Sequence, residues 1–529
     1  MEHLPGRPQV RWLGRLISFL VVTTAIVPII SGGRSATPAV AVALPLAALP
    51  SPGAAGIGDP YYPLLGNGGY DVLHYTLDLD LDVEAGSILT GIAMIEAVAT
   101  QTLSTFNLDY RGPSIVAIAV DGVPARWRRV GGELTITPVA PLKVGGAFTA
   151  VVRYAGIPDG GEDRLTRGWW ASGTAIATVG EPAGAEVWYP VNGHPLDKAT
   201  YTLSITVPEP YDVVANGQLV STADATRAGD GPSTRTFVWE NRYPTASYLV
   251  TFHAADLEVT RRPGPLGITL LEAVPPDLSR RERRAFARVP RMLALFAQWF
   301  GPYPFTAFGG TVLEDTDFDA ALETQELVTY DRSALGESKV AHELAHQWFG
   351  NSVSLERWQD IWLNEGFASY AQVLWVEGSR GKEAATAALQ RRTTALATAS
   401  AGPDGAGVRI GDPGPEHLVS PVVYSGGALL LHALRGRMGD AAFFQLVQEW
   451  TRRNQYGHAS TQDFIALAEE VSREELDTFF TVWLDTPWTP ERVAELVLEG
   501  AQPVPDALAG TLAGNESDSR AQERPRGWT

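Results

Sequence analysis

Alternation between apolar and polar residues dominates the first half of the chain. In the stretch YTLDLDLDV, the residues Leu77, Leu79, Leu81 and Val83 alternate with aspartates, which is typical of a β-strand with one buried and one solvated face. Similar short stretches recur between Gly, Pro and Asp turns: SIVAIAV, ELTITPV, FTAVVRY, YTLSITV, DVVANGQLV, RTFVWE and SYLVTFHA. Residues 68–258 are therefore predicted to form an all-β sandwich or saddle.

Helical periodicity replaces this alternation near residue 280. Apolar residues recur at helical spacing in SRRERRAFARVPRMLALFAQWFG, which stops at Gly301. One short strand-like stretch, GGTVLED, follows it. The remaining predicted helices are ESKVAHELAHQWFG, NEGFASYAQVLWVEG, KEAATAALQRRTTALATA, VYSGGALLLHALRGRMG, AAFFQLVQEWTRR, STQDFIALAEEV and REELDTFFTVWLD. The second half is predicted to be mainly α-helical with a small sheet, which makes the fold class multidomain α+β.

The two ends of the chain differ in composition from the rest. Arg7, Arg11 and Arg15 precede the apolar run LISFLVVTTAIVPII, which fits a secretory signal peptide and is short for a membrane span of about 20 residues. The alternative is that the run is retained as an N-terminal membrane anchor. Both interpretations export the rest of the chain, as a secreted or cell-envelope protein.

The same composition changes suggest where the domains begin and end. Residues 1–58 are interpreted as a signal peptide or anchor followed by an Ala/Pro-rich linker. Residues 59–260 form the predicted N-terminal β-domain and residues 261–500 the mainly helical domain. Residues 501–529 are polar and aperiodic, and are predicted to be a disordered tail.

Charge and cysteine content exclude several classes of function. The 529-residue chain carries a formal net charge of −19, which disfavours nucleic acid as a partner because binding phosphates needs a basic face. The chain has no cysteine, so disulfides, thiolate zinc sites and cysteine nucleophiles are excluded. Any metal here must be held by histidines and carboxylates.

The segment AHELAHQWFG carries the strongest chemical signal. His342 and His346 lie four residues apart on a predicted helix, so both imidazoles project from one face and can share one ion. Two neutral imidazoles suit Zn²⁺, and a catalytic zinc needs a third protein ligand. The stretch WLNEGFA supplies Glu365 after eighteen intervening residues. We therefore predict one zinc ion per chain, held by His342, His346 and Glu365.

Glu343 lies between the two histidines. A carboxylate at this position can take a proton from water activated by the metal and pass it to the leaving amine. The alternative is a salt bridge on the surface of the helix. We predict that Glu343 is the catalytic base of a hydrolase.

Together these motifs resemble those of a known protein family. HELAH, followed after eighteen residues by the Glu of WLNEGFA, resembles the M1 aminopeptidases, and the similarity extends over nearly all of residues 60–495. The resemblance implies an N-terminal β-domain followed by a thermolysin-like zinc catalytic domain. It also implies hydrolysis of the N-terminal peptide bond, with peptides that have a free N-terminus as the substrates.

The resemblance also implies two carboxylates that bind the substrate amine. Glu323 stands where the Glu of the family's GxMEN motif is expected, although Ala320, Leu322 and Thr324 replace the Gly, Met and Asn. In TVGEP, Glu181 matches a second amine-binding Glu, next to a Val where the family has Gln. The alternative for Glu323 is an exposed carboxylate on a strand, and the alternative for Glu181 is a loop residue without a binding role.

A tyrosine completes the implied site. In VYSGGA, Tyr424 matches the family's tyrosine that stabilises the oxyanion, and the Lys of the Y-x-K-G-A pattern is replaced by Gly426. A packed core tyrosine is the alternative. Two other functions stay open beside the aminopeptidase: a zinc endopeptidase or other zinc hydrolase on the same scaffold, and a catalytically silent peptide-binding protein.

Overall fold

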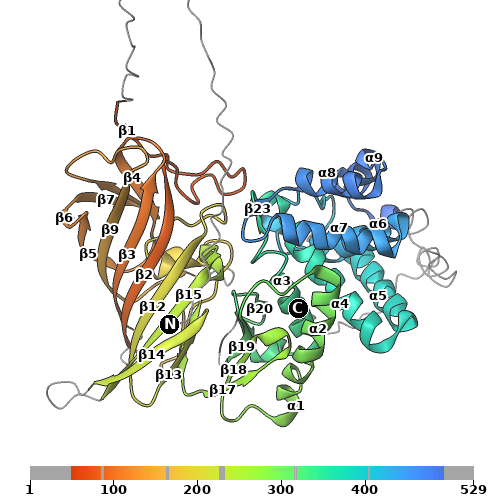
Figure 1. Cartoon of the computed structure of the whole chain (residues 1–529), viewed down its shortest axis with the longest axis horizontal. Coiled ribbons are helices and arrows are strands. Elements are labelled where there is room, and N and C mark those ends of the chain that lie inside the picture. Colours follow the sequence, from red (N-terminus) through yellow and green to blue (C-terminus); the bar gives the residue numbers. More distant parts are fainter. Residues whose placement is uncertain are drawn as a thin grey trace, which may run out of the picture. The chain divides into compact units, whose positions relative to one another are not determined.

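A computed structural model describes residues 49–84, 88–161, 166–225, 233–314, 316, 318–402 and 405–493. Strands dominate the first part of this range and helices the second, in the red-to-yellow and the green-to-blue parts of Figure 1. The predicted α+β class, with a β-rich part followed by a mainly helical part, is confirmed. The predicted signal or anchor run and the predicted tail 501–529 lie outside the described residues.

The alternating stretch becomes β2, inside an eight-stranded sheet of the described residues. Leu77, Leu79 and Leu81 are buried, whereas Asp78 and Asp80 are exposed, as the alternation predicts. β2 runs parallel to β12 and antiparallel to β3. In spatial order the sheet contains β14 (Gln218–Ala225), β15 (Thr234–Thr245), β12 (Ala199–Pro208), β2 (Tyr70–Asp82), β3 (Ile88–Ala99), β9 (Ala147–Gly156), β5 (Ser114–Val120) and β6 (Val123–Pro124).

Two further sheets of the described residues complete the β-rich part. One contains β1 (Ser51–Pro52), β4 (Leu103–Asp109), β8 (Glu133–Thr137) and β7 (Arg126–Val130). The other contains β10 (Trp170–Ala171), β11 (Ile176–Ala177), β16 (Phe252–Ala255) and β13 (Asp212–Ala215). Strand β1 lies in the stretch interpreted above as a linker.

Two stretches predicted as single strands are divided. DVVANGQLV forms β13 and β14, which belong to different sheets. The chain turns at Gly217, whose φ is 83° and whose added Cβ would lie 2.1 Å from the carbonyl oxygen of Glu240. SYLVTFHA begins as the 3-10 helix η2 (Ser247–Leu249) and becomes β16 only at Phe252.

The second half contains a larger sheet than the sequence predicted. GGTVLED forms most of β19 (Ala307–Leu313), which is central in a five-stranded sheet of the described residues. The other strands are β17 (Glu258–Pro263), β18 (Thr269–Val274), β21 (Leu327–Asp331) and β20 (Ala321–Leu322). β20 lies at the edge and pairs with β21 alone, so one side of β20 is left without a strand neighbour.

The helices of the second half lie near the predicted ranges. The α-helices are α1 (Arg280–Arg283), α2 (Val289–Phe300), α3 (Glu337–His346), α4 (Trp362–Arg380), α5 (Lys382–Ser400), α6 (Gly427–Met438), α7 (Asp440–Arg453), α8 (Thr461–Ser472) and α9 (Asp477–Phe480). The π-helical turns η8 (Val422–Gly426) and η9 (Thr481–Asp485) join them. Among the described residues, no helix combines the length and the apolar character needed to cross a membrane.

Two glycines let α4 and α6 approach each other closely. A Cβ added to Gly427 would lie 2.7 Å from the Cα of Gly366, so neither position has room for a side chain. Gly366 directly follows Glu365, and Gly427 lies three residues after Tyr424. The close crossing therefore brings the start of α4 beside the turn η8, where two of the predicted site residues lie.

Candidate metal centre

Helices α3 and α4 hold the three predicted metal ligands. His342 and His346 lie on the last turns of α3, and Glu365 lies in the first turn of α4. All three side chains are buried. Apolar residues of α3, including Leu344 and Ala345, pack in the core, so the histidines are carried by a rigid element.

The three ligands converge on one point. One ligand atom of each lies within 4.8 Å of the others. The carboxylate oxygen Oε2 of Glu365 lies 3.1 Å from Nε2 of His342 and 3.6 Å from Nε2 of His346. Tetrahedral zinc with ligands at about 2.0–2.1 Å separates its ligand atoms by about 3.3 Å. The spacing and the two-nitrogen, one-oxygen donor set both fit Zn²⁺.

Hydrogen bonding orients one of the imidazoles for this role. Nδ1 of His346 lies 3.1 Å from the carbonyl oxygen of Phe349. Only a protonated Nδ1 can donate to that carbonyl, which leaves Nε2 facing Glu365 and free to bind metal. Burial lowers the pKa of His342 to about 4, so that this imidazole is neutral, as a ligand must be.

Glu343 is buried beside the ligands, and not on the surface of the helix. Burial raises the pKa of Glu343 to about 8, although His346 and Lys339 oppose the shift. One oxygen of Glu343 lies within 4.8 Å of a ring nitrogen of His346 and of an oxygen of Glu323. A carboxylate in such surroundings can both accept and release a proton near neutral pH.

Glu323 and Glu181 come together beside the metal ligand Glu365. Glu323 directly follows the edge strand β20, and Glu181 follows β11. An oxygen of each lies within 4.8 Å of the other and of Glu365. Oε1 of Glu181 and Oε1 of Glu323 are buried with no hydrogen-bond partner among the described residues. Two such oxygens suit an ammonium group, which offers only donors.

The charges around the centre favour cations. Burial raises the pKa of Glu181 well above its ordinary value, and the neighbouring Glu323 adds to the shift. Burial likewise raises the pKa of Glu323, against the pull of His346. Four carboxylates thus converge on two imidazoles, an arrangement that a divalent metal and a bound ammonium group would neutralise.

Tyr424 lies against the metal ligands from the turn η8. Its ring stacks on the imidazole of His342 with centroids 5.8 Å apart and planes at 5°. Burial, followed by the carboxylate of Glu365, raises the pKa of Tyr424 well above its ordinary value. The phenol therefore keeps its proton and is a hydrogen-bond donor at neutral pH.

The structure adds three residues that the sequence did not single out. Gln347 donates to the carbonyl oxygen of Glu323 and accepts from the backbone amide of Glu326. Asn351 donates to the same carbonyl of Glu323 at 2.7 Å, and burial together with the neighbouring Glu323 carboxylate raises the pKa of the Tyr248 phenol. Gln347 stands directly beside the HELAH motif and could have been noticed. Tyr248 lies far away in the sequence and gave no local signal.

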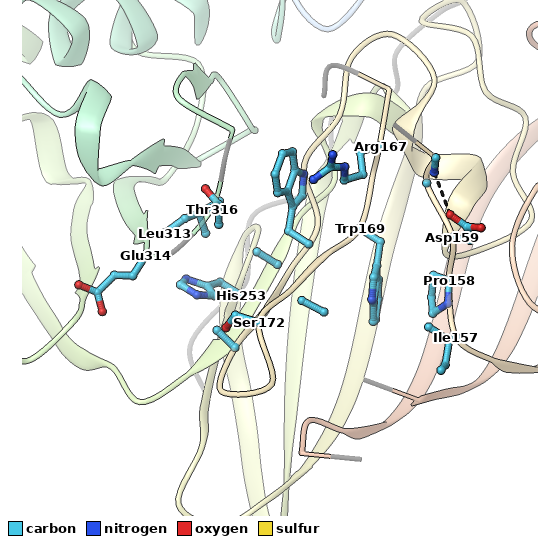
Figure 2. A pocket seen from close by; sticks show the side chains of 16 residues that line it. Ile157, Pro158, Asp159, Arg167, Trp169, Ser172, His253, Leu313, Glu314 and Thr316 are labelled. Atoms are coloured by element: carbon cyan, nitrogen blue, oxygen red, sulfur yellow. Dashed lines mark hydrogen bonds between the residues drawn. The ribbon is translucent and has the colours of Figure 1, made fainter. Parts of the chain in front are cut away.

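The predicted residues line a small pocket of about 130 Å³. Glu181, Glu365 and Tyr424 all contribute to its wall. A roomier cavity of about 400 Å³ is shown in Figure 2, where Trp169, His253 and Glu314 are among the lining side chains. None of the seven predicted site residues lines it among the residues described. The chemistry therefore belongs beside the smaller pocket, whose wall contains the metal ligand Glu365, the carboxylate of Glu181 and the phenol of Tyr424.

Comparison with known sequences identifies both halves of the chain. Residues 72–249 match the peptidase M1 N-terminal domain, and residues 284–483 match the peptidase family M1 domain. Human glutamyl aminopeptidase is 28% identical over 331 residues, which are 58% of this chain and 34% of that protein. Aminopeptidase N of Lactococcus lactis is 33% identical over 207 residues, or 34% of this chain and 24% of that protein. The chain thus spans about a third or less of the length of these relatives.

Comparison with solved structures covers more of the chain. The M1 zinc metallopeptidase of Deinococcus radiodurans superposes with a TM-score of 0.75 at 30% identity, over 82% of this chain and 98% of that one. A mutant of that enzyme, with a bound Tyr-Ser-Ala substrate, superposes with a TM-score of 0.74 over 99% of its own chain. Since the two family models match the β-rich and the helical parts in the same order as in such a two-part relative, the chain belongs to peptidase family M1.

Proposed function

We propose that the chain is a zinc-dependent aminopeptidase that hydrolyses the N-terminal peptide bond of peptides with a free N-terminus. The observation that carries this proposal is the convergence of Glu181 and Glu323 beside the metal ligand Glu365. An endopeptidase has no need of two carboxylates that each keep a buried oxygen without a hydrogen bond next to the metal ligands. The names of the relatives, and the tripeptide bound to the Deinococcus enzyme, support the same activity.

Each side chain has a defined task in this reaction. A zinc ion held by His342, His346 and Glu365 supplies Lewis-acid chemistry for attack of water on a carbonyl group. Glu181 and Glu323 bind the substrate ammonium, which places the first peptide bond at a fixed distance from the metal ligands. The substrate backbone can lie along β20, whose outer edge has no strand neighbour among the described residues.

Proton transfer and charge stabilisation fall to Glu343 and Tyr424. Glu343 accepts a proton from the attacking water, whose oxygen bonds to the carbonyl carbon. When the carbon–nitrogen bond breaks, Glu343 returns that proton to the leaving nitrogen. The phenol of Tyr424 donates a hydrogen bond to the oxyanion that forms between these two steps.

A pair of fluorogenic substrates separates this function from its alternatives. Both carry the same first residue, one with a free amino group and one acetylated. We expect cleavage of the free substrate alone, its loss with a chelator, and its return on adding zinc. Equal cleavage of both substrates would instead favour a zinc endopeptidase or other zinc hydrolase. No cleavage of either substrate by zinc-loaded protein would favour a peptide-binding protein without turnover.

We also infer that the protein is exported, either secreted or held at the cell envelope. The support is the basic segment with Arg7, Arg11 and Arg15 before the apolar run of residues 16–30. N-terminal sequencing of protein from the culture medium should find a start within residues 31–58. Protein that is found in the membrane fraction and still contains residues 16–30 would favour the N-terminal anchor. Protein found only in the cytoplasm would refute export.

A further inference from the structure

A short segment ahead of the first long strand reaches the catalytic pocket. This segment, Asp59–Leu65, is called the strap here. It precedes residue 72, where the match to the N-terminal family model begins, so no family assignment covers it. Its residue Tyr62 lines the same pocket as Glu181, Glu365 and Tyr424.

Asp59 fixes the strap to both parts of the chain. Its oxygen Oδ2 accepts from Nε2 of His194 at 3.1 Å and from the backbone amide of Trp358 at 2.8 Å. Its other oxygen accepts from the amides of Tyr61 and Tyr62. Although burial opposes the shift, these hydrogen bonds, led by that of His194, lower the pKa of Asp59. The carboxylate is therefore charged, fully engaged and able to hold Tyr62 in one place.

The strap also holds a second wall of the pocket. The hydroxyl of Tyr61 donates to Asp412 at 2.6 Å and accepts from the amide of Gly414 at 2.8 Å. The hydroxyl of Tyr62 donates to the carbonyl oxygen of Pro415 at 3.4 Å. The loop that begins here continues into Leu418 and Val419, which also line the pocket. The position of this loop thus depends on the strap.

A row of aromatic rings connects the strap with the carboxylate that is proposed to bind the substrate amine. The ring of Tyr62 meets Trp358 edge-on with centroids 6.1 Å apart, and Trp358 meets Tyr248 in the same manner at 5.3 Å. Burial and, after it, the nearby carboxylate of Glu323 raise the pKa of Tyr248, so the row of rings ends beside Glu323. These contacts fix the position of Tyr62 relative to Glu323. A residue that forms a wall of the pocket for the first side chain needs such a fixed position.

The lining of the pocket indicates which side chain it accepts. Its apolar walls are formed by Tyr62, Pro182, Ile361, Pro415, Leu418 and Val419. The charged groups of the lining are Glu181, Glu365 and Glu416. None of the described residues that line it is positively charged. An apolar side chain would find matching walls, whereas a carboxylate would meet only like charges and no partner.

We propose that the strap residue Tyr62 determines which first residue the enzyme accepts, as one wall of a pocket that binds an apolar side chain and excludes an acidic one. Asp59 is the positioning residue for this wall. The inference rests on the proposed aminopeptidase function. It goes further in naming the substrate class, in contrast to the relatives that are named glutamyl aminopeptidases.

Amidocoumarin substrates with free Leu, Ala or Glu test this inference on the zinc-loaded chain. We expect wild-type kcat/KM to be at least about 100-fold higher for Leu than for Glu, because an unpaired buried charge costs several kcal/mol. The variant Tyr62→Ala should lower the Leu-to-Ala ratio of kcat/KM about tenfold, the effect of a few lost apolar contacts. Tyr62→Phe, which keeps the ring, should preserve the ratio.

Matched variants distinguish a specific effect on the pocket from a general loss of structure. Leu64→Ala changes an exposed strap residue outside this pocket and should leave the ratio unchanged. Asp59→Asn should shift the ratio in the same direction as Tyr62→Ala. Val419→Arg changes a residue that is 47% exposed and leaves the strap intact, so the chain should fold. It should raise the Glu-to-Leu ratio at least about tenfold by pairing the substrate carboxylate.

The outcomes distinguish this inference from the function on which it rests. An unchanged Leu-to-Ala ratio in zinc-loaded Tyr62→Ala would overturn the role of the strap, and so would wild-type cleavage of Glu as fast as Leu. If Tyr62→Ala does not fold, an unchanged Glu-to-Leu ratio in Val419→Arg overturns the assignment of the pocket. Absence of cleavage of all three substrates by the wild type refutes the aminopeptidase function itself.

Discussion

The ring of Tyr424 lies parallel to the imidazole of His342, with centroids 5.8 Å apart. This stacking holds the phenol at the metal ligands without using its hydroxyl. The hydroxyl is therefore available to donate a hydrogen bond to an oxyanion, which the aromatic ring alone could not stabilise. Tyr424 would donate a hydrogen bond to this oxygen beside the residues that would hold the zinc ion.

Replacing Tyr424 by Phe should lower kcat while leaving KM nearly unchanged. The ring and its stacking on His342 remain, and only the donor to the transition state is lost. Loss of one such donor typically costs about 10²–10³ in kcat. Steady-state kinetics with a free-amine substrate measures the effect, and zinc analysis checks the site. A change confined to KM would show that Tyr424 contacts the substrate without stabilising the oxyanion.

Replacing Glu343 by Gln should abolish turnover and leave about one zinc per chain. Gln keeps the shape of the side chain but cannot accept the proton of the attacking water. Metal analysis and the fluorogenic assay on one preparation decide the matter. Loss of zinc together with activity would indicate that Glu343 serves the metal site, contrary to the role assigned here.

Replacing Glu323 by Gln should weaken the preference for a free amino group. Removing one carboxylate from a buried charge pair costs about 2–5 kcal/mol, which lowers kcat/KM for the free substrate at least about 30-fold. The acetylated substrate should stay uncleaved by the variant. Glu181→Gln should act in the same direction. An unchanged kcat/KM for the free substrate would show that the carboxylates do not recognise the amine.

Zinc binding should become tighter as pH rises. Burial alone would lower the pKa of His346, but Glu323 and Glu365 outweigh it and raise the pKa to about 10 in the metal-free chain. At neutral pH this imidazole therefore carries a proton that zinc must displace. Each unit of pH should raise the apparent affinity about tenfold between pH 6 and 9. Calorimetry in buffers of different ionisation enthalpy should count about one proton released, and a pH-independent affinity would contradict this.

The metal centre could be predicted from the sequence because its signals are local. The spacing of His342 and His346 fixes both on one helix face, and Glu365 needs only a return helix to reach them. Glu323, Glu181 and Tyr424 followed from the family resemblance. Their meeting in one pocket depends on tertiary contacts, such as the glycine contact of Gly366 with Gly427.

Other features could not be predicted because they depend on tertiary contacts or lack a distinctive local pattern. The contact of Asp59 with Trp358 joins residues 299 apart in the sequence, and no local pattern announces such a contact. The strands β18 and β21 are short apolar runs, whose periodicity does not distinguish a strand from a buried helix. The strand expected at DVVANGQLV is divided by the turn at Gly217, next to which Oδ1 of Asn216 accepts from the amide of Thr251, 35 residues away.

Mass spectrometry of one peptide, free and N-acetylated, tests the central claim most directly. The zinc-loaded chain should shorten the free peptide one residue at a time from its N-terminus and leave the acetylated peptide intact. Glu343→Gln should leave both peptides intact. Internal fragments, or equal digestion of the acetylated peptide, would contradict an aminopeptidase that holds its substrate amine between Glu181 and Glu323.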